Sequence, residues 1–160
     1  MKVQAYKLSM VREHVENFAG IRKRKISNSR TAGQIISEHL KGIDREAFVV
    51  LALDSHLRPV GINTASVGTL NVAPVYAREV FKFAILASAS SIIVGHNHPS
   101  GDRTPSDNDK EVTMKLLLAA EVLGIPINDH IIVAESGVFS FQEEGLLLPM
   151  KTEASLKLMH

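Results

Sequence analysis

The stretch SIIVGHNHPSGDRTPSDNDKEVTMKLLLAAEVLG, residues 91–124, decides the fold that we predict for this sequence. Its first five residues are small or apolar and predict a short buried strand, and a polar loop follows over residues 96–105. A helix is predicted from Ser106 to Leu123, because Ser106 can cap its first turn and Gly124 is placed to end it. A buried strand therefore leads through a polar loop into a capped helix.

Strands and helices alternate along the rest of the chain. The run Phe48 to Leu53 is almost continuously apolar, which is typical of a strand buried on both faces. Further strands are predicted over residues 58–67, 127–133 and 138–141, and helices over residues 29–40 and 74–87. This alternation predicts an α/β fold in which helices flank a mixed β-sheet.

Two of these helices carry specific expectations. Ser29 or Thr31 is expected to cap the first helix. Pro74 is expected to open the second, whose inner stripe would consist of Val75, Val80, Phe81 and Ile85. The segment over residues 145–160 is amphipathic, and its pattern assigns no single structure.

The composition limits the classes of protein that this chain can represent. With 160 residues, of which 45% are hydrophobic and 22% charged, the chain is expected to form one domain with its own core. A net charge of +1 argues neither for nor against a nucleic-acid partner. No apolar run approaches the roughly 18 residues of a membrane span, and residues 1–10 contain no stretch typical of a signal peptide. We therefore expect no membrane association and a cytoplasmic location.

The sequence contains no cysteine, which excludes disulfides, cysteine nucleophiles and thiolate metal sites. It also excludes a zinc nucleobase deaminase, because those enzymes bind their metal through a P-C-x-x-C element. Any metal must therefore be held by nitrogen and oxygen atoms.

Two histidines and an aspartate suggest such a site. Residues two apart on an extended segment share a face, so His96 and His98 can present their imidazoles to one point. Asp109 lies in the first turn of the next helix, where side chains lean back toward the N-terminus. Two imidazoles and one carboxylate, with a fourth position open, match a catalytic zinc site. In isolation, the spacing from Ser106 to Asp109 equally matches a capping box, and a lone H-x-H is weak evidence for metal.

These residues resemble a known family. His96-x-His98, then seven residues, Ser106, two residues and Asp109 form the full metal motif of the JAMM (MPN+) metalloproteases. The segments HNHPSG at 96–101 and DHII at 129–132 resemble the RadC-like branch of that family, and the similarity extends from about Ile26 to Leu148. The resemblance implies a layered α/β fold of the cytidine-deaminase-like (JAB/MPN) type, one zinc per chain held by His96, His98 and Asp109, and hydrolysis of an amide or isopeptide bond.

The resemblance also implies two catalytic residues. In the family, a glutamate at the start of an early core strand is the general acid/base, and the matching position is Glu46. Spacing alone does not select Glu46, because Glu38, Asp44 and Asp54 are also near, and a polar residue at a strand end is the simpler interpretation. Ser106 would help to hold the oxyanion of the tetrahedral intermediate, although a helix cap explains the same residue.

Other features carry weaker expectations. For Asp129 and His130 we favour packing at a strand entrance over a position beside the metal. The basic run over residues 22–25 is interpreted as a solvated turn, with contact to nucleic acid as the alternative. Residues 1–28 are expected to form an N-terminal extension, residues 29–148 the catalytic domain, and residues 149–160 a C-terminal tail.

The leading hypothesis is a zinc metallopeptidase-type hydrolase with a peptide or protein substrate. One alternative is a metal-dependent nuclease that uses Mg²⁺ or Mn²⁺, and another is a non-catalytic zinc-binding module associated with DNA repair. RadC-like proteins often carry an N-terminal helix-hairpin-helix region associated with DNA binding, and this chain is expected to be too short to include it. A nucleic-acid partner is therefore only weakly supported.

Overall fold

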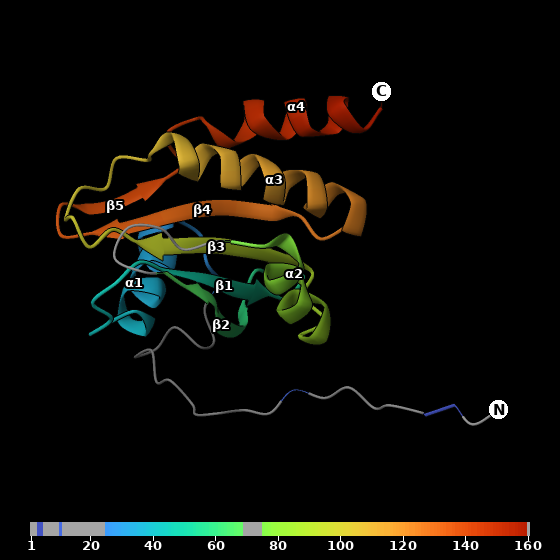
Figure 1. Ribbon diagram of the computed structural model, residues 1–160, viewed down its shortest axis with the longest axis horizontal. Coiled ribbons are helices and arrows are strands. Elements are labelled where there is room, and N and C mark those ends of the chain that lie inside the picture. The colour runs from blue at the N-terminus through green and yellow to red at the C-terminus, as the bar shows by residue number, and fades with distance from the viewer. Residues whose placement is uncertain (1–2, 5–9, 11–24, 69–74, 160) are drawn as a thin grey trace.

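A five-stranded mixed sheet forms the centre of the protein, in the strand order β2-β1-β3-β4-β5 (Figure 1). The computed structural model describes residues 3–4, 10, 25–68 and 75–159. The β3–β4 pair is parallel and the other neighbouring pairs are antiparallel. The strands are β1 (Ala47–Leu53), β2 (Pro59–Val67), β3 (Ser91–Asn97), β4 (Ile127–Ala134) and β5 (Gly137–Ser140).

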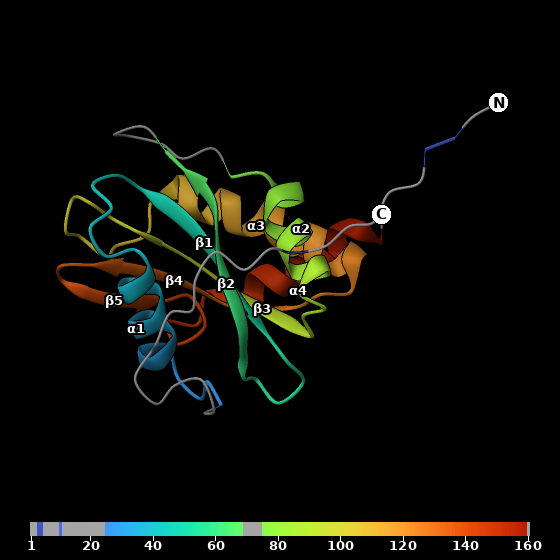
Figure 2. The same cartoon turned by 90° about the horizontal axis from the view of Figure 1, so that it is seen from below.

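Helices cover both faces of this sheet (Figures 1 and 2). One face is covered by α1, and the opposite face is covered by α2 and α3, with α4 lying on α3. The helices are α1 (Ser29–His39), α2 (Ala77–Leu86), α3 (Asp107–Leu123) and α4 (Leu147–Leu158). The predicted α/β fold with helices around a mixed sheet is confirmed.

The central strand β1 divides the core in two. All seven of its residues are buried, as expected for a strand covered on both faces. Val49 and Leu51 pack in the cluster under α1, whereas Phe48 and Val50 pack in the cluster under α2 and α3. Both faces of β1 are therefore covered by apolar side chains.

Two helix starts and one core position differ from the sequence-based expectations. Asn28 caps α1, because its side-chain oxygen accepts the backbone N–H of Thr31, so neither Ser29 nor Thr31 is the cap. Helix α2 begins at Ala77, after an extended Tyr76, and Pro74 lies outside the described residues. Ile85 is 55% exposed and Ala84 takes the expected inner position.

The two chain ends also bear on the expected domain limits. The boundary at residue 148 lies inside α4, and Ala154 of this helix is buried in the same cluster as Phe48. Ile26 is buried under α1. Most of residues 1–24, including three of the four residues of the basic run, lie outside the described residues.

Within the described parts of the chain, none of the helices has the length and apolar character needed to cross a membrane.

Candidate metal centre

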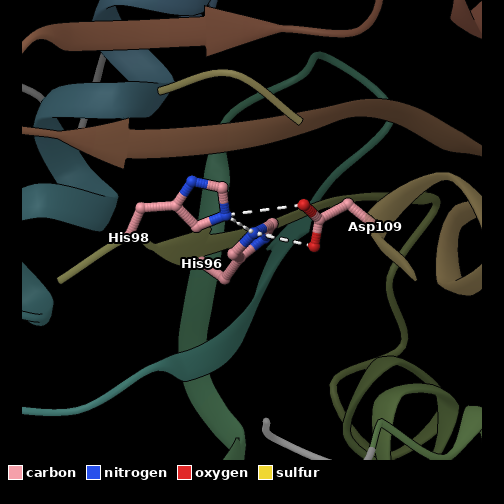
Figure 3. Close-up of side chains that lie close together, drawn as sticks. All are labelled: His96, His98 and Asp109. Atoms are coloured by element: carbon pink, nitrogen blue, oxygen red, sulfur yellow. Dashed lines mark hydrogen bonds and ion pairs between the residues drawn. The ribbon is translucent and has the colours of Figure 1, made fainter. Parts of the chain in front are cut away.

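Three side chains meet at the end of β3 nearest α3 (Figure 3). The Nε2 atoms of His96 and His98 are 2.9 Å apart. Asp109 Oδ1 is 3.2 Å from His96 Nε2, and Asp109 Oδ2 is 3.4 Å from His98 Nε2. The structure thus brings together all three residues that the sequence proposed as metal ligands.

The local sequence explains this convergence. His96 is the penultimate residue of strand β3 and His98 directly follows the strand, so both rings project from the same face. Gly95 permits close packing on the other face, since a Cβ there would lie 2.7 Å from Ile36 and 2.8 Å from the Ile131 carbonyl oxygen. A rigid strand end therefore carries both imidazoles.

The loop after His98 holds the ring of this histidine. His98 Nδ1 donates a hydrogen bond of 2.7 Å to the Asp102 carbonyl oxygen. The Asp102 carboxylate in turn accepts the backbone and hydroxyl hydrogens of Thr104, which fixes the turn. Arg103 anchors the loop to the β4–β5 hairpin through hydrogen bonds to Ser136 and the Val138 carbonyl oxygen. His98 therefore turns Nε2, and not Nδ1, toward the centre.

Asp109 is held by the start of α3. Asp109 Oδ2 accepts hydrogen bonds from the Ser106 backbone N–H at 2.7 Å and the Ser106 hydroxyl at 2.6 Å, and the Ser106 oxygen accepts the Asp109 N–H. This reciprocal arrangement is a capping box, so the expected cap at Ser106 is confirmed. The oxygen Oδ1 receives no hydrogen from Ser106 and is directed toward His96.

The electrostatics of the three residues are coupled. Burial raises the pKa of Asp109, but contacts with His96, His98 and Ser106 outweigh burial and hold this pKa well below the usual range. Contact with Asp109 raises the pKa of His98 against the opposing effect of burial. The lowered pKa keeps Asp109 ionised and the raised pKa keeps His98 protonated, so the Asp109 carboxylate attracts a cation, either a proton on the imidazole or a metal ion.

The distances between the three side chains suit a metal ion. Atoms bound about 2.0–2.1 Å from a tetrahedral zinc are separated from one another by about 3.3 Å. The two Nε2 atoms are 2.9 Å apart, each lies 3.2 or 3.4 Å from a different oxygen of Asp109, and one ligand atom from each residue lies within 4.8 Å of the other two. His96 is 1% exposed and His98 14% exposed, so the centre can be reached from the His98 side.

Glu46 lies beside this centre. Phe48 pairs with His96 across β1 and β3, and continuing this antiparallel register places Glu46 opposite His98 on the same face of the sheet. Burial raises the pKa of Glu46, and the charges of His96, Asp109 and His98 also act on it. The glutamate that the family resemblance indicated therefore lies on the same face of the sheet as the candidate ligands and within reach of their charges.

Asn97, between the two histidines, holds the chain on both sides of Glu46. Its side-chain oxygen accepts the Ala47 N–H at 2.8 Å, and its amide nitrogen donates to the Arg45 carbonyl oxygen at 3.0 Å. Of the other acidic residues considered from the sequence, Asp54 pairs with Arg58 at the opposite end of β1.

Sequence reasoning gave too little weight to His130. This histidine is fully buried and packs against Phe141, as the favoured interpretation expected, but its Nε2 also lies 2.9 Å from His96 Nδ1. Asp129 has a purely local set of partners, the Ser140 hydroxyl and the backbone N–H groups of His130 and Gln142. The segment DHII was the available signal, and only the pairing of β3 with β4 shows which of its residues faces the centre.

The protein is thus a layered α/β domain in which His96, His98 and Asp109 could hold a metal ion at a strand end, with Glu46 beside them. Residues 26–146 match the model of the RadC-like JAB domain family, and the chain belongs to this family. The observed sheet and helices agree with the JAB/MPN fold.

Several curated proteins are similar to this chain. A UPF0758 protein of Thermotoga maritima is 49% identical over 105 residues, which cover 66% of this chain and 47% of that protein. A UPF0758 protein of Symbiobacterium thermophilum is 40% identical over 129 residues, covering 81% of this chain and 55% of that protein. The chain thus spans about half the length of the curated relatives that it matches.

Proposed function

We propose that this domain is a zinc-dependent hydrolase that cleaves an amide or isopeptide bond in a peptide or protein. The observation that carries the proposal is the convergence of His96 Nε2, His98 Nε2 and the Asp109 carboxylate, with Glu46 on the same face. Membership of the JAB-domain family supports the same chemistry.

The donor set favours zinc over magnesium. Two imidazole nitrogens and one carboxylate oxygen suit zinc, whereas magnesium prefers oxygen ligands in octahedral geometry. Zinc held by His96, His98 and Asp109 would polarise a substrate carbonyl and lower the pKa of water at the fourth position to about 7.

The residues of this chain would then handle protons and charge. Glu46 is half-buried with a raised pKa, which suits a group that accepts a proton from the attacking water and returns it to the leaving amine. Asn97 would keep Glu46 in place by holding the backbone on either side of it. Ser106 donates its single hydroxyl hydrogen to Asp109, so a role at the oxyanion requires this hydrogen to turn toward the substrate.

The test combines metal analysis with a screen of substrates. Wild-type protein is expected to hold about one zinc per chain, and His96→Ala to lose it, since two remaining ligands hold zinc poorly. Fluorogenic peptides, peptides joined through lysine isopeptide bonds and a labelled DNA duplex are then offered with Zn²⁺, Mg²⁺ or Mn²⁺. Glu46→Gln should retain zinc and lose about 10²–10⁴-fold in hydrolysis. The exposed His56→Ala and Glu38→Gln serve as matched controls and should behave as wild type.

Each contrary result points to a different error. Equal zinc in wild type and His96→Ala would refute the metal centre. DNA cleavage with Mg²⁺ in place of amide cleavage would favour a nuclease, and retained zinc with no hydrolysis of any substrate would favour a binding module. A fully active Glu46→Gln would mean that another group is the base.

A further inference from the structure

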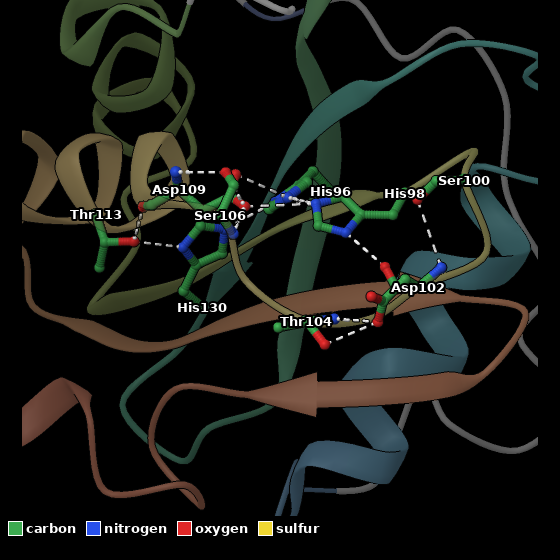
Figure 4. A network of polar contacts seen from close by, with 9 residues as sticks. All are labelled: His96, His98, Ser100, Asp102, Thr104, Ser106, Asp109, Thr113 and His130. Atoms are coloured by element: carbon green, nitrogen blue, oxygen red, sulfur yellow. Dashed lines mark hydrogen bonds and ion pairs between the residues drawn. The ribbon is translucent and has the colours of Figure 1, made fainter. Parts of the chain in front are cut away.

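A chain of buried hydrogen bonds runs behind the candidate metal centre from β3 through β4 to α3 (Figure 4). His96 Nδ1 lies 2.9 Å from His130 Nε2. His130 Nδ1 lies 2.6 Å from the Thr113 hydroxyl oxygen, which lies 2.6 Å from the Asp109 backbone carbonyl oxygen. The chain thus begins at one candidate ligand and ends at another, and both intermediate residues are fully buried.

The Asp109 carbonyl oxygen sets the direction of the hydrogen bonds in this chain. A carbonyl oxygen only accepts, so the Thr113 hydroxyl donates to Asp109 and accepts from His130 Nδ1–H. A neutral imidazole carries one ring hydrogen, so with Nδ1 donating to Thr113 the Nε2 atom of the fully buried His130 ring is an acceptor. His96 must therefore donate from Nδ1, which leaves the lone pair of His96 Nε2 directed at the centre.

Packing holds the middle of the chain in place. The His130 ring stacks on Phe141, with centroids 4.8 Å apart and planes 12° apart, and makes an edge contact with Phe48, with centroids 5.5 Å apart. Because His130 pairs with Val94 in the parallel β3–β4 ladder, the sheet itself fixes its height relative to His96. The ring has little freedom to turn or to exchange its partners.

We infer that Thr113 and His130 are positioning residues that form a hydrogen-bonded bridge between the ligands His96 and Asp109 and orient His96 for metal binding. The inference rests on the metal centre of the proposed function. Partners that hold the second nitrogen of a ligating histidine typically change metal affinity by about 10–100-fold when they are removed. The bridge adds a link between two ligands from different elements.

The test removes the hydroxyl group of Thr113, which links His130 to the Asp109 carbonyl oxygen. Thr113→Val keeps the shape of the side chain and deletes the bridge, and we expect zinc to bind about tenfold more weakly by competition with a chelator. Thr113→Ser restores the hydroxyl and should restore affinity. Thr152→Val is the matched control, because the Thr152 hydroxyl makes the same bond to the carbonyl oxygen four residues earlier, on the exposed face of α4. It should bind zinc as wild type does.

Three outcomes would overturn the bridge: unchanged affinity in a folded Thr113→Val, an equal loss in Thr113→Ser, or an equal loss in Thr152→Val. Failure of wild-type protein to bind zinc would instead refute the metal centre of the proposed function. Nitrogen NMR of ¹⁵N-histidine-labelled wild type provides a second measurement that does not depend on the folding of a variant. It should show His130 with hydrogen on Nδ1 and none on Nε2, and hydrogen on Nε2 would contradict the bridge.

Discussion

Each imidazole of the candidate centre has one nitrogen committed to the protein and one turned toward its neighbours. His96 uses Nδ1 toward His130, and His98 uses Nδ1 toward the Asp102 carbonyl oxygen. When both rings are neutral, their Nε2 atoms are acceptors facing each other and the Asp109 carboxylate. The lone pairs of these nitrogen and oxygen atoms repel one another unless a proton or a metal ion lies between them. This repulsion explains the direction of the pKa shifts of Asp109 and His98.

This competition between proton and metal predicts that zinc affinity depends on pH. A raised pKa means that His98 stays protonated to a higher pH than an ordinary histidine, whose pKa is about 6.5. Zinc must displace that proton, so affinity should fall by about tenfold per pH unit for each displaced proton as the pH drops below the raised pKa. Chelator competition between about pH 8 and pH 5.5 measures the effect.

The free energy of unfolding of the metal-free protein should instead decrease as the pH rises, because the folded state binds the His98 proton more tightly than the unfolded state does. A pKa above the unfolded value stabilises the fold fully below about pH 6.5, and this contribution disappears as the pH rises through the folded-state pKa. Urea unfolding in the presence of EDTA checks the sign. Zinc affinity that stays constant over the whole range would contradict protonation of a ligand.

Among the elements, α3 supplies both structure and chemistry with the same residues. Ser106 and Asp109 form the capping box that starts the helix, and Asp109 is also a candidate ligand. The helix ends at Gly124, which adopts the left-handed conformation that favours glycine. Because the cap and the ligand share one hydrogen-bonding unit, the start of α3 and the metal centre should respond together to mutation.

Ser106→Ala tests this coupling. The loss of the cap should reduce the free energy of unfolding by about 0.5–2 kcal/mol. The loss of the hydrogen bond to Asp109 Oδ2 should weaken zinc binding by about tenfold, and loss of an oxyanion donor would lower kcat by about 10²–10³-fold. Urea unfolding, chelator competition and turnover per zinc-loaded molecule separate the three effects.

Two further variants serve as controls. Asn28→Ala removes the equivalent cap of α1, away from the centre, and should cost similar stability with unchanged zinc affinity and turnover. Ser106→Thr keeps both the capping oxygen and the hydroxyl hydrogen that is given to Asp109, so it should keep the helix, the zinc and the rate. If Ser106→Ala matches Asn28→Ala in every measurement, Ser106 is a cap and nothing more.

The elements also show what the sequence could and could not predict. The motif residues of β3 and α3 were predictable because they are close in the chain and bounded by strong signals such as Gly124. The bridge was not, because His130 meets His96 only through the pairing of β3 with β4, and it meets Thr113 only through the packing of α3 against β4. Ile85 has the spacing of an inner residue, yet it is exposed, since the smaller Ala84 is the residue that packs on the core.

At the scale of the whole molecule, one sheet separates two hydrophobic cores, and one of them contacts the candidate centre. The core under α1 contains Val49 and Leu51 and supports β1 and β3 from behind. The core under α2 and α3 contains Phe48, which stacks on His96, so this core continues into the candidate centre. Helix α4 closes the second core from outside, because Leu147 and Ala154 are buried in the same cluster. The last helix is therefore expected to stabilise the layer on which the centre is built.

Ala154→Glu tests whether this helix belongs to the cooperative unit or behaves as a separate tail. Ala154 is 1% exposed, so a glutamate there places an unpaired charge in an apolar layer. An uncompensated buried charge costs roughly 3 kcal/mol or more. Since about 1 kcal/mol changes the Tm of a domain of this size by about 2–4 °C, the Tm should fall by about 6–12 °C in a single transition.

Leu156→Glu is the matched control, because Leu156 lies on the same helix and is 53% exposed, and it should leave the Tm nearly unchanged. An equally small effect of both substitutions would show that residues 149–160 form an independent tail. A large loss at Ala154 alone would extend the folded domain to the end of α4, with the metal centre sharing its stability.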